Sequence, residues 1–220
     1  MEYKNMPDVW TEFYEKAFKH LRKSLNLNIS DNDIEKSEKI LRSFNPKVNY
    51  REIDLPPEKI FKEATAHWDC SIPLNEMINS FFLSVDLVPY IYPDTLTVLE
   101  KLKKKYRIAA LTDVASGMPD EMHRKYCAEL MPYFDFYVSS ITCGYRKPNP
   151  KGLEDIADHF GIAAHEIIVV GDEEKDIIAA KRFGCESVLV DRKNKHSDYD
   201  GLIVKDLNGF AELLMPDIEQ

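Results

Sequence analysis

Three short groups of residues carry side chains that could hold a phosphate group beside a divalent cation. The groups are Thr112 and Asp113 after the apolar run IAAL, Lys147 in GYRKPNP, and Asp172 and Asp176 in IIVVGDEEKD. A hydroxyl and the backbone N–H groups after it can donate to phosphate oxygens, and an ammonium can neutralise phosphate charge. Carboxylates are the hard oxygen ligands that Mg²⁺ prefers. The sequence therefore raises the hypothesis of a combined phosphate and metal site.

Each group alone also has a plainer structural explanation. A threonine that ends a strand is often a turn former or a helix cap. A lysine before a proline is usually a solvated loop charge, and Arg146 is a competing cation in the same loop. Asp172 can cap the following helix while the acids after it complement the positive end of that helix. The chemical interpretation therefore depends on whether the three groups meet in space.

The second half of the chain alternates short apolar strands with helices. The predicted strands are RIAALTD (107–113), FDFYVSS (134–140), EIIVVGD (166–172), SVLVD (187–191) and LIVKDL (202–207). Predicted helices include 95–105, LEDIADHF before Gly161, and DIIAAKRF before Gly184, where glycine suits a left-handed helix end. This alternation predicts an α/β fold, a doubly wound parallel sheet covered by helices on both faces. Ligands bind such sheets at the carboxyl ends of the strands, where all three groups would lie.

The first half of the chain is predicted to be helical. An apolar stripe at three- and four-residue spacing runs from Trp10 to Leu21, and further helices are expected near Ser30, after Pro56-Pro57 and after Pro73. We found no persuasive strand pattern before residue 88. The domain prediction is a helical domain over 8–88 and an α/β domain over 89–220.

Composition and charge narrow the class of protein. The formal net charge is −9, so nucleic acid and anionic membrane surfaces are not expected as partners. No apolar run approaches the ~18 residues of a membrane span, and the first residues do not resemble a secretory signal. The four widely spaced cysteines are expected to be mostly buried, reduced thiols. We therefore expect a cytoplasmic protein; the sequence does not fix its oligomeric state.

The order of the three groups resembles the haloacid dehalogenase (HAD)-like hydrolase superfamily. The chain is similar to that family in its second motif (LTD), its third (RKPNP) and its fourth (GDEEKD), and the helical first half resembles the cap domain of subfamily I. The resemblance implies a Mg²⁺-dependent phosphatase acting on a small phosphorylated substrate. It implies that Thr112, with Asp113, binds the phosphoryl group, that Lys147 neutralises charge, and that Asp172 and Asp176 hold Mg²⁺.

The first motif of that family is absent from this sequence. In the family it is DxDGT or a close variant at the end of an N-terminal strand, and its first aspartate is the covalent nucleophile. Asp8 follows polar residues, and Asp31-Asn32-Asp33 is followed by Ile34 and Glu35 rather than Gly-Thr. By the resemblance, the strand that carries this motif lies in the middle of the sheet. We therefore expect a break in the sheet, and we favour a chain that starts late over a protein that has lost turnover.

Two other functions remain open at this point. One is a catalytically inactive protein that binds phosphate, Mg²⁺ or a protein partner with the same pocket. The other is an unrelated nucleotide binder with a doubly wound sheet, which is disfavoured because no glycine-rich phosphate loop follows a strand. The substrate is not identified by the sequence, although the aromatic residues Trp10, Phe13 and Trp68, with His67, are candidates that more often belong to a core.

Overall fold

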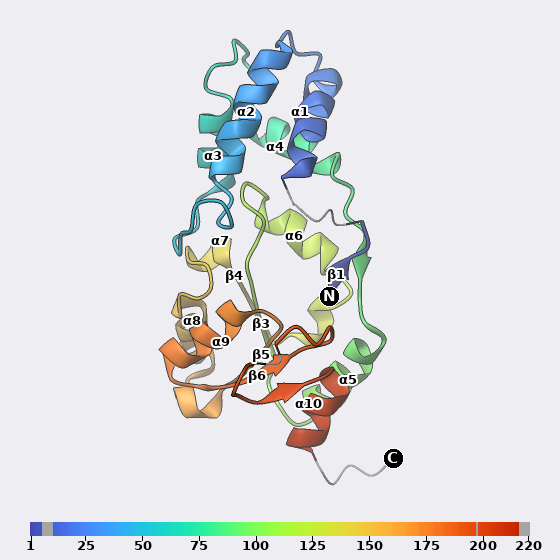
Figure 1. Cartoon of the computed structure of the whole chain (residues 1–220), viewed down its shortest axis with the longest axis vertical. Coiled ribbons are helices and arrows are strands. Elements are labelled where there is room, and N and C mark those ends of the chain that lie inside the picture. The colour runs from blue at the N-terminus through green and yellow to red at the C-terminus, as the bar shows by residue number, and fades with distance from the viewer. Residues whose placement is uncertain (6–10, 197, 216–220) are drawn as a thin grey trace. The chain divides into compact units, whose positions relative to one another are not determined.

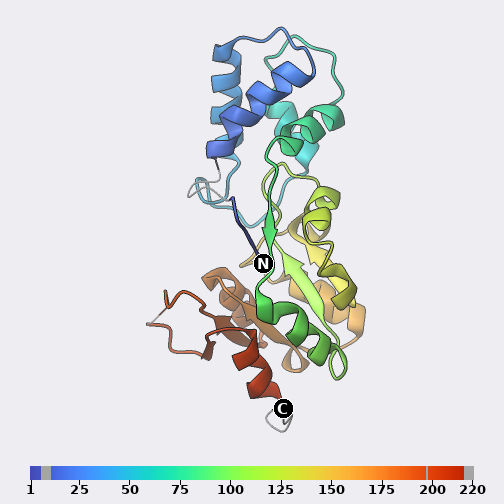
Figure 2. The same ribbon diagram turned by 90° about the vertical axis from the view of Figure 1, so that its right-hand side faces the viewer.

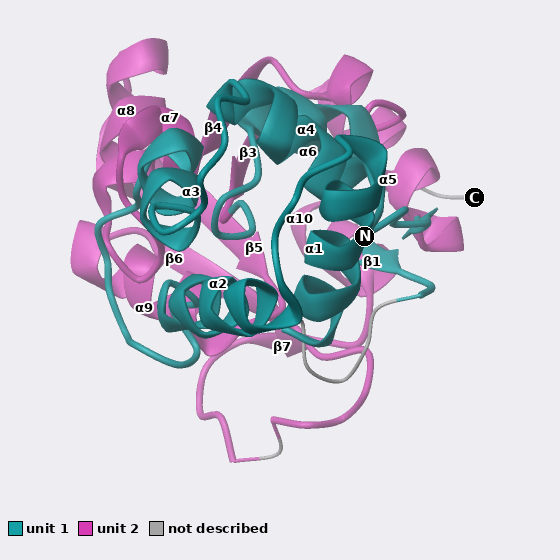
Figure 3. Cartoon of the chain, turned by 90° about the horizontal axis from the view of Figure 1, so that it is seen from above, with its two compact units in different colours: residues 1–90, 114–127 teal, residues 91–113, 128–220 magenta. Residues whose placement is uncertain are grey.

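The structure is a computed structural model that describes residues 1–5, 11–196 and 198–215. The chain divides into two compact units, drawn in different colours in Figure 3. One unit comprises residues 1–90 and 114–127, and the other comprises residues 91–113 and 128–220. The predicted boundary was a single one, between residues 88 and 89. The observed division differs because residues 114–127 group with the helical first half.

The first unit is mainly helical. Its helices and strands are β1 (Glu2–Tyr3), α1 (Glu12–Ser24), α2 (Asp31–Ser43), α3 (Pro57–Ala64), α4 (Leu74–Leu83), β2 (Pro89–Tyr90) and α6 (Asp120–Tyr126). Helices α1 to α4 pack on one another, as the blue and teal ribbons of Figure 1 show. The short strands β1 and β2 pair antiparallel, and they lie side by side in Figure 2. This pairing was not predicted, since two-residue strands leave no alternating pattern.

An aromatic cluster forms the core of the helical unit. Phe18 of α1, Phe61 of α3 and Phe81 of α4 are fully buried. The ring centroids of Phe18 and Phe81 lie 4.9 Å apart, and those of Phe61 and Phe81 lie 5.2 Å apart, both edge to face. Trp68 is also buried and contacts Phe18, so it belongs to this core. Trp10 and Asp8 lie outside the described residues.

The second unit has an α/β architecture. Its main elements are α5 (Pro93–Lys103), β3 (Ala109–Thr112), β4 (Phe136–Ser139), α7 (Ser140–Cys143), α8 (Lys151–Phe160), β5 (Ile168–Gly171), α9 (Glu174–Phe183), β6 (Glu186–Val190), β7 (Ile203–Val204) and α10 (Leu207–Leu214). Two single 3₁₀ turns, Met131–Tyr133 and Ala164–Glu166, precede β4 and β5. Helices α8 and α9 end at Gly161 and Gly184 with φ of +66° and +88°, as predicted.

Helices cover both faces of the strands, because neighbouring residues of one strand point to opposite sides. Val169 of β5 packs into a cluster with residues of α8 and α9. Val170 packs into a second cluster with residues of α5 and α10. The predicted α/β class with a doubly wound parallel sheet is confirmed, with one correction: LIVKDL is a two-residue strand, β7, and the start of α10 at Leu207.

The parallel sheet is divided into two parts. Strand β3 pairs with β4, and β5, β6 and β7 pair in that order, all parallel. Within the described residues, β3 pairs only with β4 and β5 pairs only with β6, and β3 and β5 are not hydrogen-bonded to each other. Every residue of these two apolar strands is at least partly exposed, whereas the last three residues of β6 are buried. The expected break in the sheet is therefore present: β3 and β4 form one part, and β5, β6 and β7 form the other.

A buried carboxylate joins distant elements of this unit. Asp94, at the start of α5, accepts two hydrogen bonds from Arg192, at 3.0 and 2.7 Å, and one from the backbone N–H of Leu207 at 2.8 Å. Burial acts to raise the pKa of Asp94, but these donors outweigh it and hold the pKa below its ordinary value. The contacts connect the first turn of α5, the residue two positions after β6 and the start of α10.

Candidate phosphate and metal site

Lys147 lies at the centre of the candidate site. Its ammonium is 2.7 Å from Oδ1 of Asp176 and donates to the carbonyl oxygen of Leu111 in β3 at 3.2 Å. The side chains of Lys147 and Asp176 are only 14% and 6% exposed, so this is a buried ion pair. The contact between Lys147 and Asp176 is an ion pair without hydrogen-bond alignment, since Oδ1 of Asp176 accepts no hydrogen bond within the described residues. The loop lysine is thus not a solvated surface charge.

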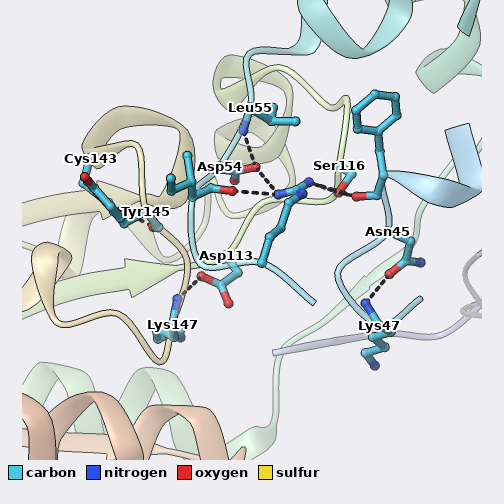
Figure 4. A network of polar contacts seen from close by, with 12 residues as sticks. Asn45, Lys47, Asp54, Leu55, Asp113, Ser116, Cys143, Tyr145 and Lys147 are labelled. Carbon is cyan, nitrogen blue, oxygen red and sulfur yellow. Dashed lines mark hydrogen bonds and ion pairs between the residues drawn. The ribbon is translucent and has the colours of Figure 1, made fainter. Parts of the chain in front are cut away.

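The loop that carries Lys147 is held at its backbone as well. Ser139 caps α7, which ends at Gly144 in the left-handed conformation, and the chain then runs through Lys147 to α8. The backbone N–H of Lys147 donates to Oδ1 of Asp113 at 3.1 Å, a contact drawn as a dashed line in Figure 4. The structure therefore brings Lys147 to the carboxyl end of β3. The peptide bond between Lys147 and Pro148 is cis, which the sequence analysis did not predict.

Asp176 has a structural function at the start of α9. Its Oδ2 accepts from the backbone N–H groups of Asp172 and Glu173, at 3.2 and 3.1 Å. Gly171 allows this close approach, since a Cβ there would overlap the Asp176 carboxyl group. Both oxygens of Asp176 are therefore engaged, one by backbone donors and one by Lys147. The capping explanation considered for this acidic run applies to Asp176 rather than to Asp172.

Asp172 is the exposed carboxylate of the site. It follows β5 directly, and its side chain is exposed, whereas that of Asp176 is buried. Mg²⁺ commonly takes one or two carboxylates and keeps several waters or phosphate oxygens. Asp172 fits such a site; Asp176 would first have to separate from Lys147. Within the described residues, no group of three or more His, Cys, Asp or Glu side chains is arranged to hold a metal.

Asp113 and Lys175 form a second ion pair beside the first. Oδ2 of Asp113 is 3.1 Å from the ammonium of Lys175, which is also 2.6 Å from Glu173. Burial acts to lower the pKa of Lys175, but the carboxylates of Asp113 and Glu173 outweigh it and raise the pKa above its ordinary value. Sequence reasoning missed Lys175. The available signal was a lysine inside an acidic run at a strand end.

Thr112 is the last residue of β3 and lies opposite Ser139 of β4. The backbone N–H groups after Thr112 were also expected to donate to phosphate oxygens. Residues 113–119, which carry them, have no helical structure, and α6 begins at Asp120 after Pro119. The contact between Thr112 and phosphate remains a prediction.

Burial disfavours Cys143 as a nucleophile in place of the absent aspartate. All four cysteines are free and half-buried, so they are reduced as expected but less buried than expected. Cys143 lies nearest in sequence to Lys147, and burial raises the pKa of its thiol. A raised pKa keeps the thiol protonated and unreactive at neutral pH. Its Sγ donates to the carbonyl oxygen of Tyr145 at 3.2 Å (Figure 4).

Known proteins resemble this chain in sequence and in fold. Residues 8–184 match a family described as haloacid dehalogenase-like hydrolase. A phosphoglycolate phosphatase from Aliivibrio fischeri is 30% identical over 110 residues, covering 50% of this chain and 48% of that protein. A phosphoserine phosphatase from Thermus thermophilus is 29% identical over 144 residues, covering 64% of this chain and 57% of that protein. The chain thus spans roughly half the length of these curated relatives.

Two solved structures share the fold. A 2-haloacid dehalogenase from Pseudomonas syringae superposes with a TM-score of 0.65 and 18% identity, covering 97% of this chain and 94% of that one. A phosphatase from Thermococcus onnurineus superposes with a TM-score of 0.60 and 21% identity, covering 92% and 88%. At this identity the similarity shows the fold alone. No helix in the described part of the chain is both long and apolar enough to cross a membrane.

Proposed function

Since the chain belongs to the haloacid dehalogenase-like hydrolase family, we propose that it supplies the phosphate- and metal-binding part of a Mg²⁺-dependent phosphatase. The proposed substrate is a small phosphorylated metabolite. The observation that carries the proposal is the buried ammonium of Lys147, held between the carbonyl oxygen of Leu111 and the carboxylate of Asp176. An ammonium fixed at the ends of two strands is suited to neutralise a phosphate group placed there.

Each predicted site residue has a distinct part in this proposal. The hydroxyl of Thr112 donates to the phosphoryl group, and Lys147 neutralises its charge. Asp172 binds Mg²⁺, and Asp176 holds Lys147 and orders the backbone on which Asp172 lies. Bound Mg²⁺ would stabilise the negative charge on phosphate oxygens during transfer. Asp113 remains a candidate neighbour of the substrate, but both of its oxygens already have partners.

The nucleophile in this proposal is an aspartate outside the present sequence, which would form an aspartyl-phosphate. The break in the sheet supports this part, because in the described part of the chain β3 pairs only with β4 and β5 only with β6, which leaves one edge of each free for a strand between them. A parallel strand in that position would bring its carboxyl end beside Thr112 and Lys147. It would also cover the half-exposed apolar residues of β3 and β5.

The matched relatives support the substrate class. Phosphoglycolate and phosphoserine phosphatases are named for small phosphate esters. Small anionic esters suit a chain with a net charge of −9 only if the site supplies local cations. The ammonium of Lys147 and a bound Mg²⁺ would supply that charge.

Adding the absent strand is expected to create turnover. The test variant carries, before Met1, a strand of five apolar residues followed directly by Asp-Xaa-Asp-Gly-Thr. We expect this variant to hydrolyse p-nitrophenyl phosphate with Mg²⁺ and the unmodified chain to show no hydrolysis above background. The matched control has asparagine in place of the first added aspartate. Hydrolysis by the control at the same rate would contradict the proposed nucleophile.

A non-catalytic binding protein is the second candidate function. It is favoured by the pairing of both lysines, Lys147 and Lys175, with carboxylates of the chain itself. It predicts that the added strand creates no hydrolysis of any phosphomonoester in a panel that includes phosphoglycolate and phosphoserine. Inorganic phosphate would still bind in that case. The same set of proteins therefore distinguishes the two functions.

A further inference from the structure

Two lysines and two aspartates form two ion pairs near the carboxyl ends of β3 and β5. Lys147, from the loop after α7, pairs with Asp176 of α9. Lys175 of α9 pairs with Asp113, at the end of β3. Each pair thus joins α9 to another segment of the chain.

Asp113 is the residue at which three of these segments meet. Its side chain is 7% exposed. One oxygen accepts from the backbone N–H of Lys147, and the other faces the ammonium of Lys175. A buried carboxylate keeps its position only while its charge is compensated. Lys175 supplies the compensating charge.

Glu173, the other partner of Lys175, does not depend on it in the same way. The side chain of Glu173 is 50% exposed, so water can solvate its carboxylate when the lysine is absent. Asp113 has much less access to water, so loss of Lys175 would drive its carboxylate to rotate toward solvent. That rotation weakens the hydrogen bond that holds the backbone of Lys147.

We propose that Lys175 is a positioning residue that, through Asp113, fixes the backbone of the phosphate-binding residue Lys147. This inference rests on the proposed function, because it gives Lys175 a part in phosphate binding. Lys175 does not touch the phosphate in this account. Its effect passes along one path, from the Lys175 ammonium to the Asp113 carboxylate and from there to the N–H of Lys147.

The direct readout is the backbone amide of Lys147, observed by NMR in the full chain. In Lys175→Met we expect the exchange rate of this amide to rise about tenfold or more, as expected for loss of a hydrogen bond to a charged acceptor. Lys175→Arg, which keeps the positive charge, is expected to restore most of the protection. Lys181→Met serves as the matched control, since Lys181 is an exposed lysine of the same helix.

Titration with inorganic phosphate supplies the second readout. Lys175→Met is expected to weaken phosphate binding about threefold to tenfold, and Lys175→Arg is expected to recover it. In an Asp113→Asn background, replacing Lys175 by methionine should have little further effect, because no buried charge then needs a partner.

Two results would overturn the inference. One is weakened phosphate binding in Lys175→Met with the Lys147 amide unchanged, which would mean that Lys175 contacts the anion directly. The other is an unchanged Lys147 amide together with unchanged phosphate binding. If the wild-type chain bound no phosphate, the proposed function would fail, yet the amide measurement would still test the link from Lys175 to Lys147.

Discussion

Replacing Asp176 by alanine is expected to lower the free energy of unfolding of the α/β unit by about 3–5 kcal/mol. The change leaves the buried ammonium of Lys147 without its carboxylate and removes the acceptor of two backbone N–H groups. Replacing Asp172 by alanine is expected to change the same quantity by less than about 0.5 kcal/mol, because the Asp172 side chain is exposed. We therefore expect Asp176, and not Asp172, to stabilise the fold of the α/β unit.

The difference in the free energy of unfolding between the two variants can be measured by urea unfolding, with hydrogen exchange of the β5 and β6 amides as the signal. Trp68 belongs to the helical unit, so its fluorescence provides an internal control that should change little in either variant. The converse expectation concerns the metal: Asp172→Ala should lose Mg²⁺ binding while remaining as stable as the wild-type chain. Equal loss of stability in the two variants would contradict the structural function of Asp176 at the start of α9.

Replacing Lys147 by methionine is expected to weaken the binding of inorganic phosphate by about tenfold to a hundredfold. The change removes the buried ammonium that we propose to contact the anion, while methionine fills a similar volume. Isothermal titration with phosphate in the presence of Mg²⁺ measures the effect. Lys151→Met is the matched control, since the side chain of Lys151 forms an i,i+4 ion pair with Asp155 on α8.

Loss of Lys147 also leaves Asp176 buried without a cation, so the single variant could unfold. The double variant Lys147→Met with Asp176→Asn avoids that unpaired charge and keeps an acceptor for the N–H groups of Asp172 and Glu173. We expect this double variant to fold and to bind phosphate as weakly as the single variant. Phosphate binding at wild-type strength in the folded double variant would exclude Lys147 as the anion-binding residue.

Much of the α/β unit could be predicted from the sequence, because its elements have strong local patterns. The strands β3 to β5 lie within the predicted apolar runs, and β6 begins one residue before its run, at Glu186. Helices α8 and α9 end at the predicted glycines, Gly161 and Gly184. The break in the sheet was also predicted, because the sequence lacks the strand that carries the family's first motif.

The features that the sequence did not predict depend on long-range contacts. Residues 114–127 join the helical unit, where Ser116 accepts a hydrogen bond from Arg51 and donates to the carbonyl oxygen of Phe44. Such contacts leave no periodic signal in the residues that make them. The same is true of the ion pair between Asp113 and Lys175, whose partners are 62 positions apart (175 − 113).

The site itself was predicted in composition but not in arrangement. All five predicted site residues belong to one unit: Thr112 and Asp113 at the end of β3, Lys147 in the loop after α7, Asp172 after β5 and Asp176 in α9. The sequence could not show that Lys147 pairs with Asp176, because pairing depends on which side chain is buried. Their assignment to phosphate and Mg²⁺ remains a prediction.

We expect the edge formed by the carboxyl ends of β3 and β5 to bind phosphate and Mg²⁺ together although the nucleophile is absent. Titration of the chain with inorganic phosphate, with and without Mg²⁺, measures this coupling. Mg²⁺ is expected to strengthen phosphate binding about fivefold or more, and Asp172→Ala is expected to remove this effect while leaving the stability of the chain unchanged. Phosphate binding that is absent, or that is the same with and without Mg²⁺, would exclude a combined phosphate and Mg²⁺ site.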